Sequence, residues 1–119
     1  MKIPYVNLSY QNSKYKKTLT SIFKKILDSG EYVGGKEVIA FEKNISKYCK
    51  SKYAVALNSG TDALTLAMYV CGVRSGDEVI TTPNSFIAST ATIVHLGAKP
   101  VFVDVLDDQN IDPDKIERV

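Results

Sequence analysis

The sequence predicts an α/β domain in which helices cover the faces of a mostly parallel sheet. Three short strand-like runs lie at residues 53–57, 78–81 and 101–105, and helix-like segments separate them. Leu57, Ile80 and Val103 follow one another at steps of 23 residues, one in each run. This regular step fits right-handed βαβ crossovers between parallel strands.

Two amphipathic helices are predicted before the first strand, so that residues 1–52 form an N-terminal helical segment. The first helix ends at Gly30, a loop covers residues 31–35, and the second helix runs from about 36 to 49. The apolar faces recur at helical spacing and comprise Tyr15, Leu19, Ile22, Phe23, Ile26 and Leu27 in the first helix, and Val38, Phe41, Ile45 and Tyr48 in the second.

The α/β domain is predicted to start at residue 53 and to alternate strands with helices. The segment 61–71 is apolar nearly all round, which is typical of a helix covered on both sides. A turn at 75–77 precedes the second strand, and a helix over 85–96 ends at Gly97. Asp112 and Pro113 predict the start of a last helix. Three strands make a narrow sheet with exposed edges, so we expect the chain to be the front part of a longer enzyme.

The composition is that of a soluble globular protein, with 45% hydrophobic and 24% charged residues in 119. The net charge of +2, from 15 basic and 13 acidic residues, is too balanced to indicate nucleic-acid or membrane binding. Lysines cluster between residues 14 and 25, but they share that segment with an apolar stripe and are interpreted as a solvated helix face. The sequence shows no membrane-spanning run and no secretory signal.

The cysteines and the histidine are interpreted as structural. Cys49 and Cys71 lie 22 residues apart in helix-like segments and are expected to be small buried apolar residues rather than a disulfide or metal site. His95 has no cysteine or histidine at ligand spacing, so no metal is expected. Together these features suggest a reducing cytoplasm.

The loop between the first strand and its helix has the chemistry of an anion site. Ligands of open α/β sheets bind beyond the carboxyl ends of the strands. The backbone amides of Gly60, Thr61 and Asp62 would form the open N-terminus of a helix, whose dipole favours a phosphate monoester. A capping turn made by Ser59 or Thr61, with Asp62 offsetting the dipole, explains the loop without a ligand and is favoured on the loop alone. Neither a P-loop nor a G-x-G-x-x-G fingerprint is present.

A second loop, TTPNSF, adds an aromatic side chain at the same end of the sheet. Asn84 or Ser85 is predicted to cap the next helix, which leaves Phe86 in its first turn. A flat ring beside a phosphate site suits a flat, phosphorylated cofactor, although a core position is the safer assumption for any lone aromatic residue.

Four segments together resemble the DegT/DnrJ/EryC1/StrS sugar aminotransferases, which use pyridoxal 5′-phosphate and have the aspartate-aminotransferase fold (fold type I). The segments are GEYVGGKEVIAFEKNISKYC, YAVALNSGTDALTLAM, GVRSGDEVITTPNSFIASTATIVHLGAKPVFVDV and NIDPDKIE. The resemblance covers almost the whole chain. It implies that residues 53–119 begin the cofactor-binding large domain.

The resemblance also implies roles for the matching residues. Gly60, Thr61 and Asp62 would hold the cofactor phosphate, and Phe86 would stack on the pyridine ring. The loop 32–35 would lie near the active site, at a dimer interface. The family's catalytic lysine, and the aspartate that pairs with the pyridinium nitrogen, occur further along its chains. Lys36, Asp104 and Asp107 do not match those motifs, and a structural role at the strand end is expected for Asp104, so no catalytic residue is predicted here.

The activity implied is transfer of an amino group, from glutamate, to a nucleotide-linked keto-sugar by a homodimer. The product would enter surface polysaccharide, glycan or antibiotic synthesis. Two alternatives stay open on the sequence: a sugar dehydratase of the same family that lacks the lysine, and a non-catalytic α/β fragment.

Overall fold

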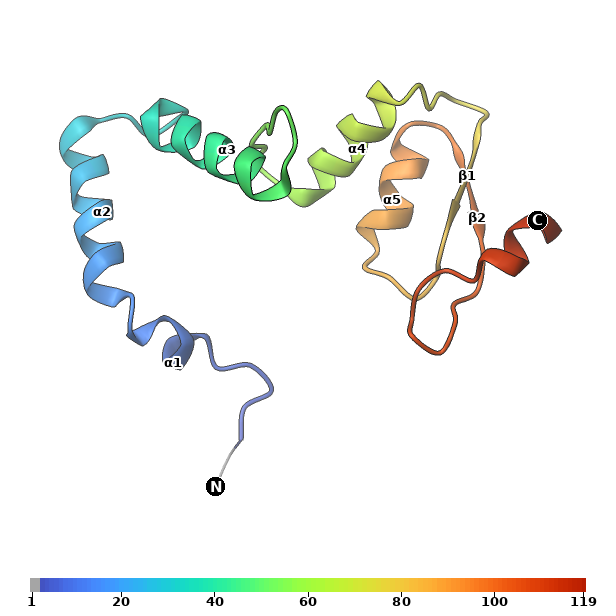
Figure 1. The fold of residues 1–119 in the computed structure, drawn as a ribbon, viewed down its shortest axis with the longest axis horizontal. Helices are drawn as coiled ribbons and strands as arrows, with labels where there is room; N and C mark the ends of the chain where they lie inside the picture. Colours follow the sequence, from blue (N-terminus) through green and yellow to red (C-terminus); the bar gives the residue numbers. More distant parts are fainter. Residues whose placement is uncertain (1–2) are drawn as a thin grey trace. The chain divides into compact units, whose positions relative to one another are not determined.

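The computed structural model describes residues 3–119, except for the side chain of Arg118, and divides them into two compact units. The N-terminal unit ends at Ala56, and the C-terminal unit runs from Leu57 to Val119. Figure 1 shows helices α1 to α3 in the first unit, and helices α4 and α5 with strands β1 and β2 in the second.

Local signals set the three helices of the N-terminal unit. α1, Leu8–Ser13, was not expected from the apolar pattern; it starts at Asn7, whose side chain accepts a hydrogen bond of 3.0 Å from the Tyr10 amide. α2, Lys16–Ser29, ends as predicted at Gly30, which adopts the left-handed conformation. α3, Gly35–Cys49, begins one residue before the predicted boundary.

The apolar faces of these helices lie uncovered in the structure. None of the residues described in the N-terminal unit is buried. Leu19 is 53% exposed and Phe23 62% exposed on α2, and Phe41 is 56% exposed on α3. The predicted helices therefore form, but the apolar side chains on their predicted faces remain largely exposed.

The strand predicted at residues 53–57 is wrong. This segment forms no strand, and Tyr53 and Val55 are exposed. A strand requires a neighbouring backbone, and no part of the described chain pairs with this one. The Ala56 amide instead donates to the Glu42 carboxylate at 2.8 Å.

The C-terminal unit contains the predicted parallel pairing. β1, Glu78–Thr81, has the expected boundaries, and β2, Lys99–Phe102, starts two residues earlier than expected. The strands pair in parallel, with Glu78 opposite Lys99 and Thr81 opposite Phe102. α5, Ala88–His95, connects them and packs against both, while α4, Gly60–Val70, packs against α5. A single βαβ crossover thus organises this unit.

The core of the C-terminal unit lies between α5 and the strands. Ile93 and Val103 are 1% and 2% exposed, and Ala88 and Ala98 are also buried. Thr92 is fully buried, with its hydroxyl donating to the Ala88 carbonyl at 2.7 Å. The prediction that the helix after the first loop is covered on both sides is wrong, because α4 packs mainly against α5 and its Leu66, Tyr69 and Val70 side chains are exposed.

The chain ends in a short 3₁₀ helix, Pro113–Arg118, that starts where Asp112 and Pro113 predicted a helix. The Asp112 side chain caps it by accepting from the Asp114 amide at 3.0 Å. Cys49 and Cys71 are free and exposed, so their predicted burial is wrong. None of the helices formed by residues 3–119 has the length and apolar character needed to cross a bilayer.

Candidate functional site

The C-terminal ends of β1 and β2 and the N-terminal ends of α4 and α5 lie toward the same end of the C-terminal unit, at its lower side in Figure 1. Three loops therefore lie toward that end: residues 58–59 before α4, 82–87 before α5, and 103–112 after β2. This is the end of an α/β sheet at which ligands bind.

Ser59 caps α4 in a reciprocal arrangement with Asp62. The Ser59 hydroxyl oxygen accepts from the Asp62 amide at 3.0 Å, and the same hydroxyl donates to the Asp62 carboxylate at 2.9 Å. The Ala63 amide donates to the Ser59 carbonyl at 3.1 Å. The loop therefore forms the predicted capping turn, and the Asp62 amide is already hydrogen-bonded to the Ser59 hydroxyl.

Two amides of the first turn of α4 stay open. Neither Gly60 nor Thr61 donates its backbone N–H to an acceptor among residues 3–119. A Cβ added at Gly60 would meet nothing within 4 Å, so the protein's own packing does not require glycine there. The Thr61 side chain is half-buried in the same turn. These donors at a helix N-terminus fit a phosphate, while the Asp62 carboxylate opposes one.

Phe86 lies in the loop before α5 and not in the first turn of that helix. α5 starts at Ala88 after the N-cap residue Ile87, which makes no side-chain capping bond. The predicted caps are wrong, because the Asn84 amide bonds to Gln109 and the Ser85 hydroxyl lies 2.9 Å from that of Ser89. Phe86 is 76% exposed, so it is not part of the core that the described residues form.

Asp104 acts as a local cap after β2, the kind of role expected for it. One of its carboxylate oxygens accepts from the Val105 amide at 2.9 Å, and the other lies 3.4 Å from the Lys115 ammonium. The Val105 amide and, less strongly, Lys115 lower the pKa of Asp104. Lys115 also lies 3.3 Å from the Asp112 carboxylate, and Asp112 and Asp104 together raise the pKa of Lys115.

The turn between Leu106 and Asn110 was not anticipated as part of the site. The Leu106 amide donates to the Asn110 carbonyl, and the Gln109 amide to the Leu106 carbonyl. Asp108 accepts from the backbone and side-chain amides of Asn110, which lower the pKa of Asp108. Turn-forming residues in DDQN could have predicted a turn. Nothing in the sequence pattern pairs it with Asn84.

Two other features singled out from the sequence lie outside these loops. The loop 32–35 belongs to the N-terminal unit, where Tyr32 is exposed. His95 occupies the last turn of α5 and is exposed. In the described part of the chain, no group of three or more His, Cys, Asp or Glu side chains is placed to hold a metal.

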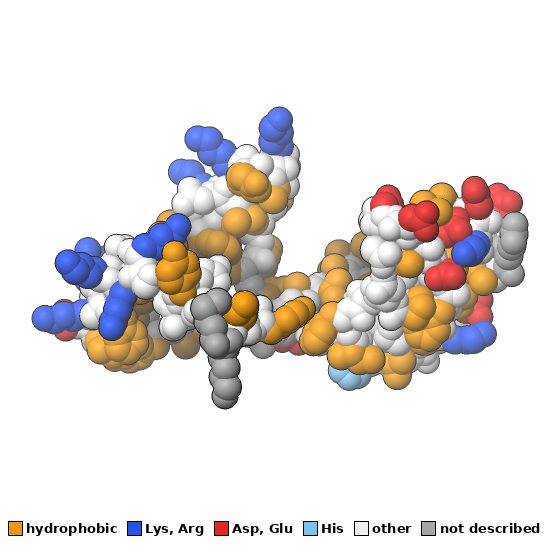
Figure 2. Space-filling view, turned by 90° about the horizontal axis from the view of Figure 1, so that it is seen from below, with side chains coloured by type: hydrophobic (Ala, Val, Ile, Leu, Met, Phe, Trp, Pro, Cys, Tyr) orange, Lys and Arg blue, Asp and Glu red, His pale blue; other side chains and the backbone are white. Residues whose placement is uncertain are grey.

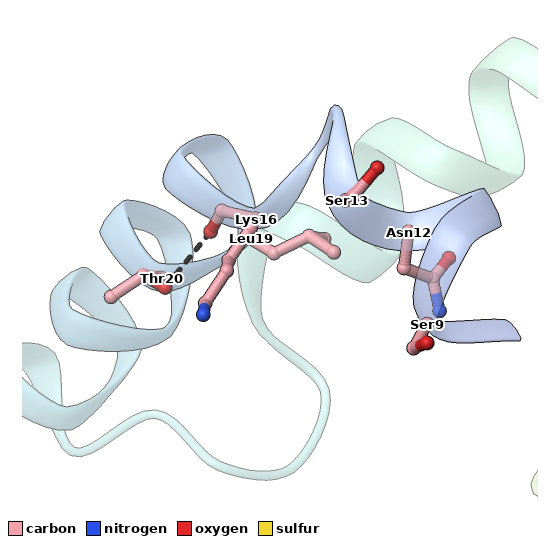
Figure 3. A pocket seen from close by; sticks show the side chains of 6 residues that line it. All are labelled: Ser9, Asn12, Ser13, Lys16, Leu19 and Thr20. Atoms are coloured by element: carbon pink, nitrogen blue, oxygen red, sulfur yellow. Dashed lines mark hydrogen bonds between the residues drawn. The ribbon is translucent and has the colours of Figure 1, made fainter.

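A shallow pocket of about 430 Å³ lies where α1 meets α2, and it contains none of the predicted site residues. Figure 3 shows Lys16, Leu19 and Thr20 contributed by α2, and Ser9, Asn12 and Ser13 contributed by α1. The dashed bond joins the Thr20 hydroxyl to the Lys16 carbonyl at 2.9 Å. All six lining residues are exposed, and no buried polar group points into the pocket, so we assign it no function.

Residues 13–119 match the DegT/DnrJ/EryC1/StrS aminotransferase family. The chain belongs to this family. It is 40% identical to the dTDP-3-amino-3,6-dideoxy-alpha-D-galactopyranose transaminase of Aneurinibacillus thermoaerophilus, over 97% of this chain and 32% of the relative. The chain thus spans about a third of the length of the curated relatives that it matches.

Solved structures of family members have the same fold. The crystal structure of DesV from S. venezuelae, in complex with a ketimine intermediate, superposes with a TM-score of 0.92 at 35% identity, over 98% of this chain and 32% of DesV. NtdA from Bacillus subtilis, solved with bound cofactor PMP, gives a TM-score of 0.86 at 33% identity, over 98% of this chain and 27% of NtdA. The architecture is accordingly that of the N-terminal part of the fold type I aminotransferases.

Proposed function

We propose that the C-terminal unit holds the phosphate and ring of pyridoxal 5′-phosphate. The observation that carries this proposal is the pair of open amides, on Gly60 and Thr61, at the same end of the unit as the exposed ring of Phe86. The two amides and the Thr61 hydroxyl donate to the phosphate, and the Asp62 amide joins them once it leaves Ser59. Phe86 packs on the face of the pyridine ring.

The protein to which these residues belong is, in this proposal, a sugar aminotransferase. When bound, the cofactor supplies an electron sink for transfer of an amino group. The relative from A. thermoaerophilus is a transaminase named for a dTDP-linked amino sugar, which supports a nucleotide-linked keto-sugar as acceptor. We further propose glutamate as donor, a homodimer as the working form and the cytoplasm as its location. The catalytic lysine and the pyridinium partner belong to the two thirds of the family's length that this chain does not span.

A chimaera tests the activity. Residues 1–119 replace the equivalent third of the S. venezuelae enzyme, to which they are 35% identical with a TM-score of 0.92. We expect borohydride to trap the cofactor on a lysine of the S. venezuelae portion, and glutamate to be converted to 2-oxoglutarate when the keto-sugar is present. Failure to trap cofactor in a folded chimaera would contradict the proposed aminotransferase role.

Substitutions in α4 test the phosphate site in the same chimaera. Gly60→Ala places a methyl group where the protein leaves space, so we expect unchanged folding stability but weaker retention of the cofactor. Thr61→Val is expected to weaken retention by about 1–3 kcal/mol, the cost of an unmet polar partner. Thr65→Val is the matched control, because the Thr65 hydroxyl donates to the Thr61 carbonyl, one turn further along the helix. Equal retention in the Thr61 and Thr65 variants would return Thr61 to a purely structural role.

A further inference from the structure

Gln109 holds a backbone conformation that its residue type disfavours. Its φ is +69°, and the other non-glycine residue with a positive φ between residues 3 and 119 is Lys50, which ends α3. Gln109 ends no helix. A glycine would adopt this conformation without steric strain, whereas a glutamine adopts it where surrounding interactions offset the strain.

The glutamine side chain ties together two loops that are distant in sequence. Its Oε1 accepts from the Asn84 side-chain amide at 2.6 Å, across 25 residues. Its Nε2 lies 3.4 Å from the Asp107 carbonyl, to which it donates a longer hydrogen bond. Asn84 is two residues before Phe86 in the loop between β1 and α5.

The two loops differ in how they are held. The turn that carries Gln109 is closed by backbone hydrogen bonds of 2.8 and 2.9 Å and by the bridge between Val105 and Ile111. The loop 82–87 donates no backbone N–H to an acceptor in the described chain; its Phe86 and Ile87 carbonyls accept from the start of α5, and the Ser85 hydroxyl lies 2.9 Å from that of Ser89. A turn closed by its own hydrogen bonds thus contacts, through one side chain, a loop whose other hydrogen bonds lie at its α5 end.

We propose that Gln109 is a positioning residue for Phe86, holding the loop 82–87 through Asn84 so that the aromatic ring is fixed beside the Gly60–Thr61 site. The consequence for cofactor binding rests on the proposed function. The tether itself does not, since it joins two groups of this chain. Gln109 touches no cofactor in this arrangement and acts through Asn84 alone.

The tether is tested without cofactor, by ¹⁵N relaxation of the 119-residue chain. In the unsubstituted chain we expect backbone order parameters near 0.8 at Ser85 and Phe86, falling to roughly 0.6 in Gln109→Ala and Gln109→Gly. Gln109→Gly relieves the backbone strain, so this loss of order is expected without loss of stability. Asn110→Ala is the matched control, because it removes another amide of the same turn and leaves the tether intact. Unchanged order in both Gln109 variants would overturn the proposal.

The link to the cofactor is tested separately in the chimaera. Gln109→Ala is expected to weaken the binding of pyridoxal 5′-phosphate about 3- to 10-fold, and Asn110→Ala is expected to leave the binding affinity unchanged. Asn84→Ala combined with Gln109→Ala should weaken binding no more than either change alone, because both remove one interaction. Looser order at Phe86 with unchanged affinity would overturn the positioning role. The Gly60 and Thr61 variants report independently on whether the cofactor binds at α4.

Discussion

The two units differ in what holds their helices in place. α2 carries a regular apolar stripe, yet Leu19 and Phe23 on that stripe are 53% and 62% exposed. α5 has the weaker amphipathic pattern, yet its Ile93 is 1% exposed, because two strands and a second helix pack around it. Periodicity therefore reports where a helix forms, and burial depends on the partner that the fold supplies.

The two units also differ in the sign of the charge that they carry. Residues up to Ala56 include eleven of the 15 basic residues and only four of the 13 acidic ones. Figure 2 shows the lysines over the first unit and the acidic side chains gathered over the second. The salt bridges between described side chains, Lys99–Glu78, Lys115–Asp104 and Lys115–Asp112, all belong to the C-terminal unit. In the C-terminal unit, Lys99 thus joins β2 to β1 and Lys115 joins the last helix to Asp104, whereas the described lysines of the N-terminal unit are exposed.

A matched pair of isoleucine substitutions gives the largest expected contrast. Ile93→Ala removes a fully buried side chain from the core and should lower the free energy of unfolding of the C-terminal unit by about 2–5 kcal/mol. Ile22→Ala makes the same change on α2, where the side chain is 44% exposed, and should change stability by about 0.5 kcal/mol or less. Urea unfolding followed by resolved amide signals from each unit measures both values.

The outcome that breaks this comparison is a large effect of Ile22→Ala. A loss of about 2 kcal/mol or more would mean that the apolar face of α2 is covered in solution by a partner, such as a second copy of the chain. Repeating the measurement over a range of protein concentrations shows whether that partner is a second copy of the chain, since stabilisation by self-association depends on concentration.

Gly97→Ala is expected to have the next largest effect. Gly97 ends α5 with φ of +75°, and an added Cβ would lie 2.8 Å from the Ser75 hydroxyl oxygen and 3.3 Å from the Ser75 Cα. The left-handed backbone alone costs an alanine about 1–2 kcal/mol, and the overlap adds to this. Gly72→Ala is the control: its φ is +97°, but nothing lies within 4 Å of the added Cβ. If both variants lose the same stability in urea unfolding, the contact with Ser75 contributes nothing.

Elements that depend on neighbouring residues alone were predictable from the sequence. The end of α2 at Gly30, the start of the last helix at Asp112 and the boundaries of β1 all follow from local patterns. The absence of a strand at residues 53–57 could not be predicted from the sequence. An apolar run forms a strand only where another strand pairs with it. The predicted burial of Cys49 and Cys71 was wrong for a similar reason, since a buried side chain requires packing partners.

The candidate site was predictable in part. A glycine-containing loop and the helix that follows it place the Gly60 and Thr61 amides, and the sequence shows that order directly. The engagement of the Asp62 amide by Ser59 could be named only as one of two alternatives, because capping and anion binding use the same donors. The hydrogen bond between Asn84 and Gln109 spans 25 residues, and Gln109 makes it from a left-handed backbone conformation. No local sequence pattern specifies either feature.

The smallest expected effect is on pH dependence, and it is confined to the C-terminal unit. The pKa of Asp104 is lowered in the folded chain, so its contribution to stability is present above the ordinary value of about 3.9 and is lost as the pH falls through the folded value. The pKa of Lys115 is raised, so its contribution is present below the ordinary value of about 10.4 and is lost as the pH rises through the folded value. Both groups are solvent-exposed and screened, so the change in stability should be small.

The amide of Val105 reports this titration directly, because it donates to the Asp104 carboxylate at 2.9 Å. Its ¹H shift is expected to move with a midpoint below 3.9, and Asp104→Asn should abolish that transition by removing the titrating group. Lys115→Gln removes the nearby positive charge and should raise the midpoint toward the ordinary value, but not restore it, since the Val105 amide is the larger cause of the shift. A midpoint at or above 3.9 in the unsubstituted chain would mean that the carboxylate is not held by that amide in solution. The Asp104 cap would then be no more ordered than the solvated lysines of α2.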